Sequence, residues 1–250
     1  MNRPTPASAL AMFHEVAEEV AEVLARQRDW GASGGRTGQY AVDLAADASC
    51  SELLLGRGYR VLSEESGVQG PEDAPMVVVD PLDGSTNASR GIPWYATTLC
   101  LVDPDGPAVS MVANHATGQR HWAVRGEGAR SDDGAIAVSG CAEVPDSLVG
   151  ISGLPDRDYG WAQFRALGAA APDICAVADG TLDAWVDMSV DAHGVWDYLA
   201  AVAICREAGG VAVDAMGRDL VTLDHGARRT PVVAATEALL DVLATRRRGP

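Results

Sequence analysis

The amino-acid sequence predicts a mixed α/β protein of the α+β type, in which helices and strands alternate along 250 residues. Residues 8–28 carry apolar side chains at helical spacing, which is typical of an amphipathic helix. The three consecutive valines at 77–79 are typical of a short strand that is covered on both faces. The chain is long enough for one large domain or for two small lobes that share a core.

The first half of the chain shows this alternation clearly. Ser8 is a suitable N-cap for the amphipathic helix at 8–28, and the glycine-rich stretch that follows predicts a loop at 29–39. Pro81 lacks a backbone N–H and is expected to end the valine strand. The remaining expected elements are a helix at 40–55, strands at 58–62 and 77–80, a helix that begins near residue 85, a strand at 94–102, and a hairpin made by 109–114 and 119–124.

The first half ends near residue 140, so we expect an N-terminal lobe at 1–140 and a C-terminal lobe at 141–250 within one structural unit. The pair Gly209-Gly210 is a typical C-cap, and Arg246–Arg248 is expected to be a frayed, solvated tail. The expected elements are a strand at 147–152, a helix or helical turn at 159–167, a helix at 172–179, a strand at 182–186, a helix at 195–208, strands at 211–214 and 231–235, and a helix at 237–245.

The composition disfavours several classes of function. A formal net charge of −16 disfavours nonspecific binding to nucleic acid or to an anionic membrane surface. All 19 basic residues are arginine, which excludes a lysine nucleophile, a Schiff base or a P-loop. The five cysteines are scattered without a C-x-x-C pair, which favours a reducing cytoplasm over a disulfide framework or a zinc site. We see no apolar run long enough for a membrane span and no secretory signal.

The chain is organised around residues 77–87, where the predicted strand ends at an acidic turn with the sequence DPLDGS at 80–85. Ser85, Thr86 and Asn87 are suitable N-cap residues for a helix whose free N–H groups would point at whatever the carboxylates hold. A phosphate ester bound through a metal ion needs both acids and such N–H groups. The alternative interpretation is an ordinary Asp-Pro turn with solvated acids.

A second acidic pair, Glu64 and Glu65, follows the predicted strand at 58–62. Two neighbouring strands would bring this pair to the same edge of a sheet as Asp80 and Asp83. Carboxylates about 5 Å apart repel each other by about 3 kcal/mol per pair at an effective dielectric near 20, so such a cluster is hard to maintain without cations. Oxygen ligands without cysteine or histidine indicate Mg²⁺ rather than zinc. On its own, an acidic pair at a strand end is more often solvated.

Three motifs stand in order along the chain: SEES at 63–66, DPLDGS at 80–85, and Trp196-Asp197 followed by EAGG at 207–210. Together they resemble the inositol monophosphatase family, which consists of Mg²⁺-dependent, lithium-sensitive phosphatases. The resemblance extends from the first helix to about Thr236. It implies a layered α-β-α-β-α sandwich, and the predicted order of strands and helices is consistent with that architecture.

The resemblance implies two to three Mg²⁺ ions. Glu64, Asp80 and the backbone carbonyl of Leu82 would hold the first ion. Asp80, Asp83 and Asp197 would hold the second. A weaker third ion would use Glu64 and water molecules. From the sequence alone, Asp197 is equally well explained as an acid that complements the dipole of its helix.

The resemblance also implies catalytic roles. Glu65 would orient the site or a metal-bound water, and Ser85, where the family usually has threonine, would take the proton of the attacking water together with Asp47. The backbone N–H groups of Gly84 and Ser85 would bind the phosphate. Asp47 is otherwise explained as an acid in the first turns of a helix. Arg36 is a candidate replacement for a lysine that the family often has in this early loop.

The substrate contacts implied by the resemblance lie in the second half. Gly168, Ala169 and Ala170 match a segment of small residues that lines the pocket. Asp187 matches the acid that binds hydroxyl groups of the sugar or inositol. The interval from this acid to Trp196-Asp197 is longer than usual in the family, so Asp191 is an alternative for the same role.

The implied activity is hydrolysis of a phosphate monoester of a small polyol by a metal-activated water, with inositol 1-phosphate as the expected substrate. The alternatives are histidinol phosphate or another sugar or polyol phosphate and, less favoured, fructose 1,6-bisphosphate or a 3′-phosphoadenosine nucleotide. A non-catalytic binding module would be expected to lack at least one metal ligand. This chain has all four implied ligand acids, Glu64, Asp80, Asp83 and Asp197. Because family members are commonly homodimers, we expect a cytoplasmic homodimer with a small phosphate ester as its partner.

Overall fold

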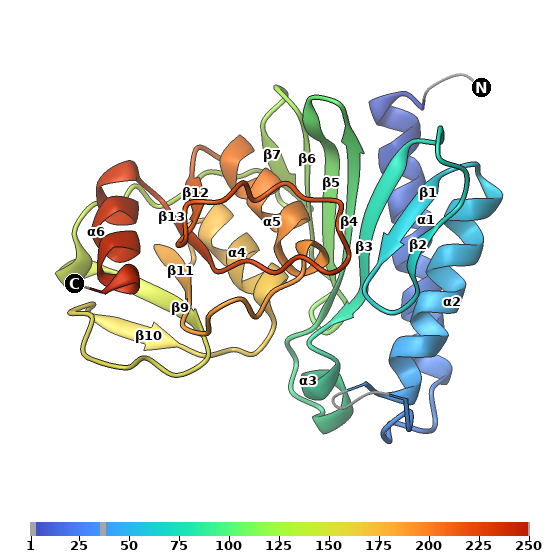
Figure 1. Cartoon of the computed structure of the whole chain (residues 1–250), viewed down its shortest axis with the longest axis horizontal. Coiled ribbons are helices and arrows are strands. Elements are labelled where there is room, and N and C mark those ends of the chain that lie inside the picture. Colours follow the sequence, from blue (N-terminus) through green and yellow to red (C-terminus); the bar gives the residue numbers. More distant parts are fainter. Residues whose placement is uncertain (1–3, 36–38, 250) are drawn as a thin grey trace.

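The computed structural model describes residues 4–35 and 39–249. Two sheets alternate with three layers of helices, as Figure 1 shows from right to left. Helices α1 (Pro6–Arg26) and α2 (Ala41–Gly56) cover the outer face of the larger sheet. Helices α4 (Ala170–Ala178) and α5 (Val195–Glu207) lie between the sheets, and α6 (Glu237–Arg248) covers the far side of the smaller one. This layering confirms the predicted α-β-α-β-α sandwich.

The larger sheet has eight strands in the order β2-β1-β3-β4-β5-β6-β7-β8. Neighbouring strands pair in antiparallel fashion except β1 and β3, which run parallel. The carboxyl ends of β1 and β3 therefore meet at one edge of the sheet, as predicted. The strands are β1 (Arg60–Ser63), β2 (Gly67–Gln69), β3 (Met76–Asp83), β4 (Ala96–Asp103), β5 (Gly106–Asn114), β6 (Arg120–Val124), β7 (Ala129–Ser131) and β8 (Gly134–Ala135).

The smaller sheet has five strands in the order β10-β9-β11-β13-β12. Its strands are β9 (Leu148–Ser152), β10 (Gln163–Arg165), β11 (Ala184–Asp187), β12 (Val211–Asp214) and β13 (Pro231–Ala234). A short helix α3 (Ser85–Arg90) follows β3, and a 3-10 turn (Val144–Asp146) precedes β9. In the part of the chain that the structure describes, no helix is long and apolar enough to cross a membrane. All five cysteines lie in that part and are free thiols.

The valine run of β3 shows how the layers are joined. Val77 and Val79 are buried against α1 and α2, whereas Val78 is buried on the opposite face, in the core that contains α4 and α5. A third core lies between the smaller sheet and α6. Alternating side chains of a strand point to opposite faces, so a continuous apolar run is required where both faces are covered. The prediction of a doubly covered strand is confirmed.

Two predicted helix starts are wrong. Helix α1 begins at Pro6, and Thr5 rather than Ser8 caps it, because the Thr5 side chain accepts a hydrogen bond from the Ser8 N–H at 3.2 Å. A proline near the first helical position fits this earlier start. Helix α3 is preceded by Gly84, whose φ is +86°, so its N-cap is this glycine and not one of the three polar residues that follow.

Three further predictions differ from the structure. Pro81 does not end β3, which continues to Asp83 through a register shift against β4; a β-bulge tolerates the missing N–H of proline. The segment 159–167 forms no helix but contributes β10, which pairs with β9. The arginines at the end of α6 are not a frayed tail: Arg246 donates to the carbonyl of Tyr159, and Arg247 Nε donates to the carbonyl of Asp187 at 2.5 Å.

Candidate active site

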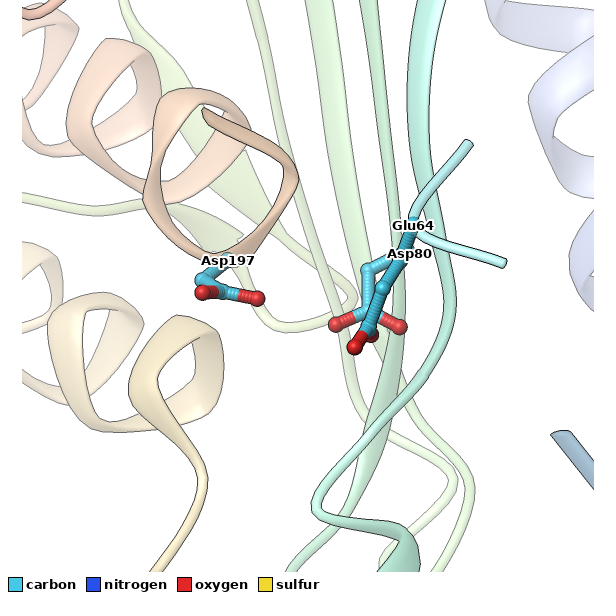
Figure 2. Close-up of side chains that lie close together, drawn as sticks. All are labelled: Glu64, Asp80 and Asp197. Atoms are coloured by element: carbon cyan, nitrogen blue, oxygen red, sulfur yellow. The ribbon is translucent and has the colours of Figure 1, made fainter. Parts of the chain in front are cut away.

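The described acids gather where β1 and β3 end. The Glu64 N–H donates to the Val79 carbonyl at 3.3 Å, which continues the parallel pairing of the two strands by one residue. Figure 2 shows the carboxylates of Glu64 and Asp80 side by side, with Asp197 facing them from the first turn of α5. One ligand oxygen from each of the three acids lies within 4.8 Å of the others. Two strands of the larger sheet and helix α5 thus bring the three carboxylates together.

Asp80 is the central acid of this group and is only 2% exposed. Its burial, together with the negative charges of Glu64, Asp83 and Asp197, raises the pKa of the Asp80 carboxyl well above its usual value. Its Oδ1 accepts a hydrogen bond from the Leu82 N–H at 2.9 Å, which opposes that rise. A buried carboxylate with partly buried carboxylates around it favours a bound cation. The all-oxygen donors suit a hard divalent ion such as Mg²⁺.

Asp83, which was predicted with these acids, has a different immediate partner. Its Oδ2 accepts a hydrogen bond at 2.6 Å from the N–H of Ala171, in the first turn of α4. Burial and the neighbouring charge of Asp197 raise the pKa of the Asp83 carboxyl to about 7. Asp83 therefore lies beside Asp197 and joins β3 to the helical layer between the sheets.

Gly84 allows the predicted phosphate-binding turn to lie against the segment of small residues. A Cβ at this position would lie 2.8 Å from the Cβ of Ala169 and 3.0 Å from the Trp94 carbonyl, and the positive φ also disfavours other residues. Gly168 lies next to the side chain of Asn87, whose amide donates to the carbonyls of Trp94 and Leu167, both at 2.8 Å. The structure therefore brings the two predicted segments together.

Ala170 lies at the start of α4, next to Ala171, whose N–H donates a hydrogen bond to the Asp83 carboxylate. Ser85 is the first residue of α3 and is partly exposed, so its hydroxyl can reach solvent beside the acidic edge. The backbone N–H groups at the start of this short helix have no partner within it. The contacts of Gly84 and Ser85 with a phosphate remain predictions.

Asp47 lies in α2, buried beneath the turn that carries Glu64 and Glu65. Its Oδ1 accepts hydrogen bonds from the hydroxyls of Ser63 and of Ser66, the latter at 3.2 Å. Its described hydrogen bonds are thus to the two serines that flank the acidic pair, and none is to the predicted partner Ser85.

Glu65 accepts a hydrogen bond from the side-chain amide of Gln39, and its own N–H donates to the Ser63 hydroxyl at 3.2 Å. These contacts join the acidic pair to the segment that precedes α2. Arg36, the predicted replacement for a lysine, lies outside the described residues.

The two predicted substrate acids of the second half have partners within the protein. The Asp187 side chain is fully buried, and its Oδ1 accepts a hydrogen bond from the Ser189 N–H at 2.8 Å. This burial does not favour a direct contact between Asp187 and a substrate. Asp191 is exposed and forms an ion pair with Arg218 at 2.6 Å. A substrate hydroxyl would have to compete with that arginine for the Asp191 carboxylate.

Sequence reasoning missed His193, which lies four residues before Asp197. Its Nδ1 is 3.2 Å from Asp197 Oδ2. Burial lowers the pKa of this imidazole, but hydrogen bonding and charge from Asp197, with the charges of Asp187 and Asp83, raise it overall to about 9. The four-residue spacing was visible in the sequence, but His193 precedes the helix, so helical periodicity does not reveal the contact.

Known proteins resemble this chain over most of its length. The sequence profile of the inositol monophosphatase family matches residues 7–248. The chain is 34% identical over 242 residues to the fructose-1,6-bisphosphatase/inositol-1-monophosphatase of Archaeoglobus fulgidus, and the match covers 92% of this chain and 94% of that protein. It is 32% identical over 213 residues to the inositol-1-monophosphatase of Mesorhizobium japonicum, and the match covers 78% of this chain and 76% of that protein.

Solved structures show the same fold. A Pyrococcus horikoshii protein with similarities to inositol-1 monophosphatase matches this structure with a TM-score of 0.81 at 24% identity, covering 94% of this chain and 95% of that chain. The sequence profile spans nearly the whole chain, and the archaeal relative exceeds 30% identity over most of both proteins. The chain therefore belongs to the inositol monophosphatase family, whose members are phosphoric monoester hydrolases.

Proposed function

We propose that this protein hydrolyses the phosphate monoester of a small polyol and uses Mg²⁺ bound at the acidic edge of the larger sheet. The observation that supports this proposal best is the approach of Glu64, Asp80 and Asp197 to within 4.8 Å of one another. Asp83 and the Leu82 carbonyl are the remaining proposed ligands, for two to three ions in total. When bound, Mg²⁺ lowers the pKa of water and neutralises charge on the phosphate.

The chain's own groups have proposed tasks around the reacting phosphate. The N–H groups of Gly84 and Ser85 bind its oxygens. The Ser85 hydroxyl accepts a hydrogen bond from the attacking water, and the proton of that water passes on to the carboxylate of Asp47, the base proposed with Ser85. Asp47 holds the Ser63 and Ser66 hydroxyls, so we also assign it the task of fixing the turn that carries Glu64 and Glu65. Glu65 then orients the water. Positioning and charge neutralisation suffice for phosphoryl transfer, so no covalent nucleophile is needed.

Inositol 1-phosphate is the proposed substrate. The name of the Mesorhizobium relative supports it. Fructose 1,6-bisphosphate is the second candidate, because the Archaeoglobus relative carries both activities in its name. We propose that a polyol contacts the segment 168–170, with Asp191 as an additional contact if its ion pair with Arg218 opens.

A panel assay tests this proposal directly. Phosphate release is measured with Mg²⁺ and with a chelator, using inositol 1-phosphate, histidinol phosphate, fructose 1,6-bisphosphate, 3′-phosphoadenosine 5′-phosphate and glycerol 2-phosphate. We expect Mg²⁺-dependent release that is fastest with inositol 1-phosphate. Faster Mg²⁺-dependent release from another compound would support the proposed metal site but would change the proposed substrate. Release that is equally fast in the chelator would contradict the metal-dependent mechanism.

We also propose that the protein is a cytoplasmic homodimer. The five free thiols suit a reducing compartment, and the composition carries no sign of a membrane or nucleic-acid partner. The expected mass in light scattering is about twice that of the 26.0 kDa chain at micromolar concentration. A mass that remains that of one chain as the concentration is raised would refute the dimer.

A further inference from the structure

His193 lies between two acids, with only 14% of its side chain exposed. Its Nδ1 is 3.2 Å from Asp197 Oδ2. On the other side of the ring, Nε2 is 3.8 Å from Asp187 Oδ1 and 3.3 Å from the Ser152 hydroxyl. An ionised carboxylate can only accept a hydrogen bond, so the proton of the bond to Asp197 belongs to His193 Nδ1.

The two oxygens of Asp197 have different environments. Oδ2 accepts from the imidazole of His193 and also from the Gly194 N–H at 2.8 Å. Among the described residues, none donates a hydrogen bond to Oδ1. Figure 2 shows one oxygen of Asp197 directed at Glu64 and Asp80 and the other turned away. Two donors on one oxygen fix the rotation of the carboxylate and leave the other oxygen available for a cation.

The smaller sheet and its surroundings hold the His193 ring. Trp185 of β11 contacts the His193 ring in an edge-on arrangement at a centroid distance of 5.5 Å. The His193 N–H donates to the Arg229 carbonyl at 3.3 Å, and the Arg229 N–H donates to the His193 carbonyl at 2.9 Å. Asp187 of the same strand has no exposed side-chain surface, and its Oδ2 has no hydrogen-bond partner among the residues that the structure describes. Because Asp187 ends β11 and is shielded from solvent, its position in the fold keeps its carboxylate close to His193 Nε2.

We propose that His193 is a positioning residue that fixes the Asp197 carboxylate for metal binding and links it through Asp187 and Ser152 to the smaller sheet. This inference rests on the proposed function, because it requires Asp197 to be a metal ligand. Removal of a residue that hydrogen-bonds to a metal-ligating side chain commonly weakens metal affinity by about 10- to 100-fold. His193 contacts neither the proposed phosphate site nor Glu64 in any described hydrogen bond.

Three substitutions distinguish this hydrogen bond from simple packing. Asparagine places its amide N–H where Nδ1 lies, so His193→Asn can still donate to Asp197. Glutamine places its amide near Nε2, so His193→Gln retains a donor toward Asp187 and Ser152 but loses the one to Asp197. His193→Ala loses both. His121→Gln is the matched control, because His121 is also a buried histidine paired with an acid, Asp179, at 3.1 Å.

Mg²⁺ affinity is measured by calorimetric titration of the metal-free proteins, and the melting temperature of each variant is recorded in a chelator. We expect His193→Gln and His193→Ala to bind Mg²⁺ about 10-fold or more weakly, and His193→Asn to stay within about 3-fold of the unmodified protein. The control should bind normally even if its melting temperature falls. KM for substrate at saturating Mg²⁺ should be unchanged in all four variants.

Two results would overturn the inference while leaving the proposed function intact. One is normal Mg²⁺ affinity in both His193→Gln and His193→Ala. The other is an equal loss in His193→Asn and His193→Ala, which would indicate packing rather than a hydrogen bond to Asp197. Absence of Mg²⁺ binding by the unmodified protein would instead refute the proposed function, and the inference with it.

Discussion

Substitution of Asp80 by asparagine is expected to abolish Mg²⁺-dependent phosphate release and to stabilise the metal-free protein. Asp80 is almost fully buried, and this burial together with three neighbouring acids raises the pKa of its carboxyl. Unit charges about 5 Å apart interact by about 3 kcal/mol at an effective dielectric near 20, so removal of this carboxylate relieves repulsion of that order. The same carboxylate is shared by both proposed ions, so the loss of activity should be about 1,000-fold or more.

Urea unfolding of the Asp80→Asn variant in a chelator tests the stability part of this prediction. We expect its free energy of unfolding to exceed that of the unmodified protein by about 1–3 kcal/mol near pH 8 and by less near pH 5. Addition of Mg²⁺ should then stabilise the unmodified protein much more than the variant. Asp105→Asn, at an exposed position in the β4–β5 turn, is the control. Full activity, or lower stability with Mg²⁺-dependent stabilisation retained, would argue against a metal site centred on Asp80.

The second large effect is expected in the pH dependence of stability, through Asp173. This residue of α4 is 1% exposed and accepts hydrogen bonds from the indoles of Trp94 at 2.7 Å and Trp185 at 3.1 Å. Burial raises the pKa of its carboxyl to about 8. In the unfolded chain its pKa is about 4, so between these values the folded state binds more protons than the unfolded state. Stability therefore falls as the pH rises from about 4 to about 8.

Asp173→Asn should reduce this loss of stability with rising pH. One proton contributes at most about 1.4 kcal/mol per pH unit, so the stability difference between pH 5 and pH 8 should shrink by a few kcal/mol. Asp80 and Asp83 also have raised pKa values and act in the same direction, but they remain in the variant, and the difference between the two curves isolates Asp173. Urea unfolding in a chelator at four pH values measures both curves. Parallel curves would mean that Asp173 is not protonated in the folded protein.

Local patterns predicted the elements that have strong periodicity or a strong stop signal. The apolar spacing of α1, the valines of β3 and the glycine pair after α5 each identified an element that the structure contains. Predictions failed where a distant partner decides the conformation. The segment 159–167 contains the strand β10 (Gln163–Arg165) because β9 offers it an edge to pair with. Arg246 and Arg247 are ordered because the carbonyls of Tyr159 and Asp187 accept their hydrogen bonds.

By itself, the sequence determined the family through its three motifs, and the resemblance to that family implied the layer order and a set of candidate ligand acids. Hydrophobic periodicity, which is a local property of the chain, predicted individual helices and strands. Only the tertiary structure decided how the acids differ. It turned Asp83 toward α4, buried Asp187, paired Asp191 with Arg218, and placed His193 behind Asp197. Burial and the charges of neighbours set the partners and pKa of a carboxylate, and both depend on residues that are distant in the sequence.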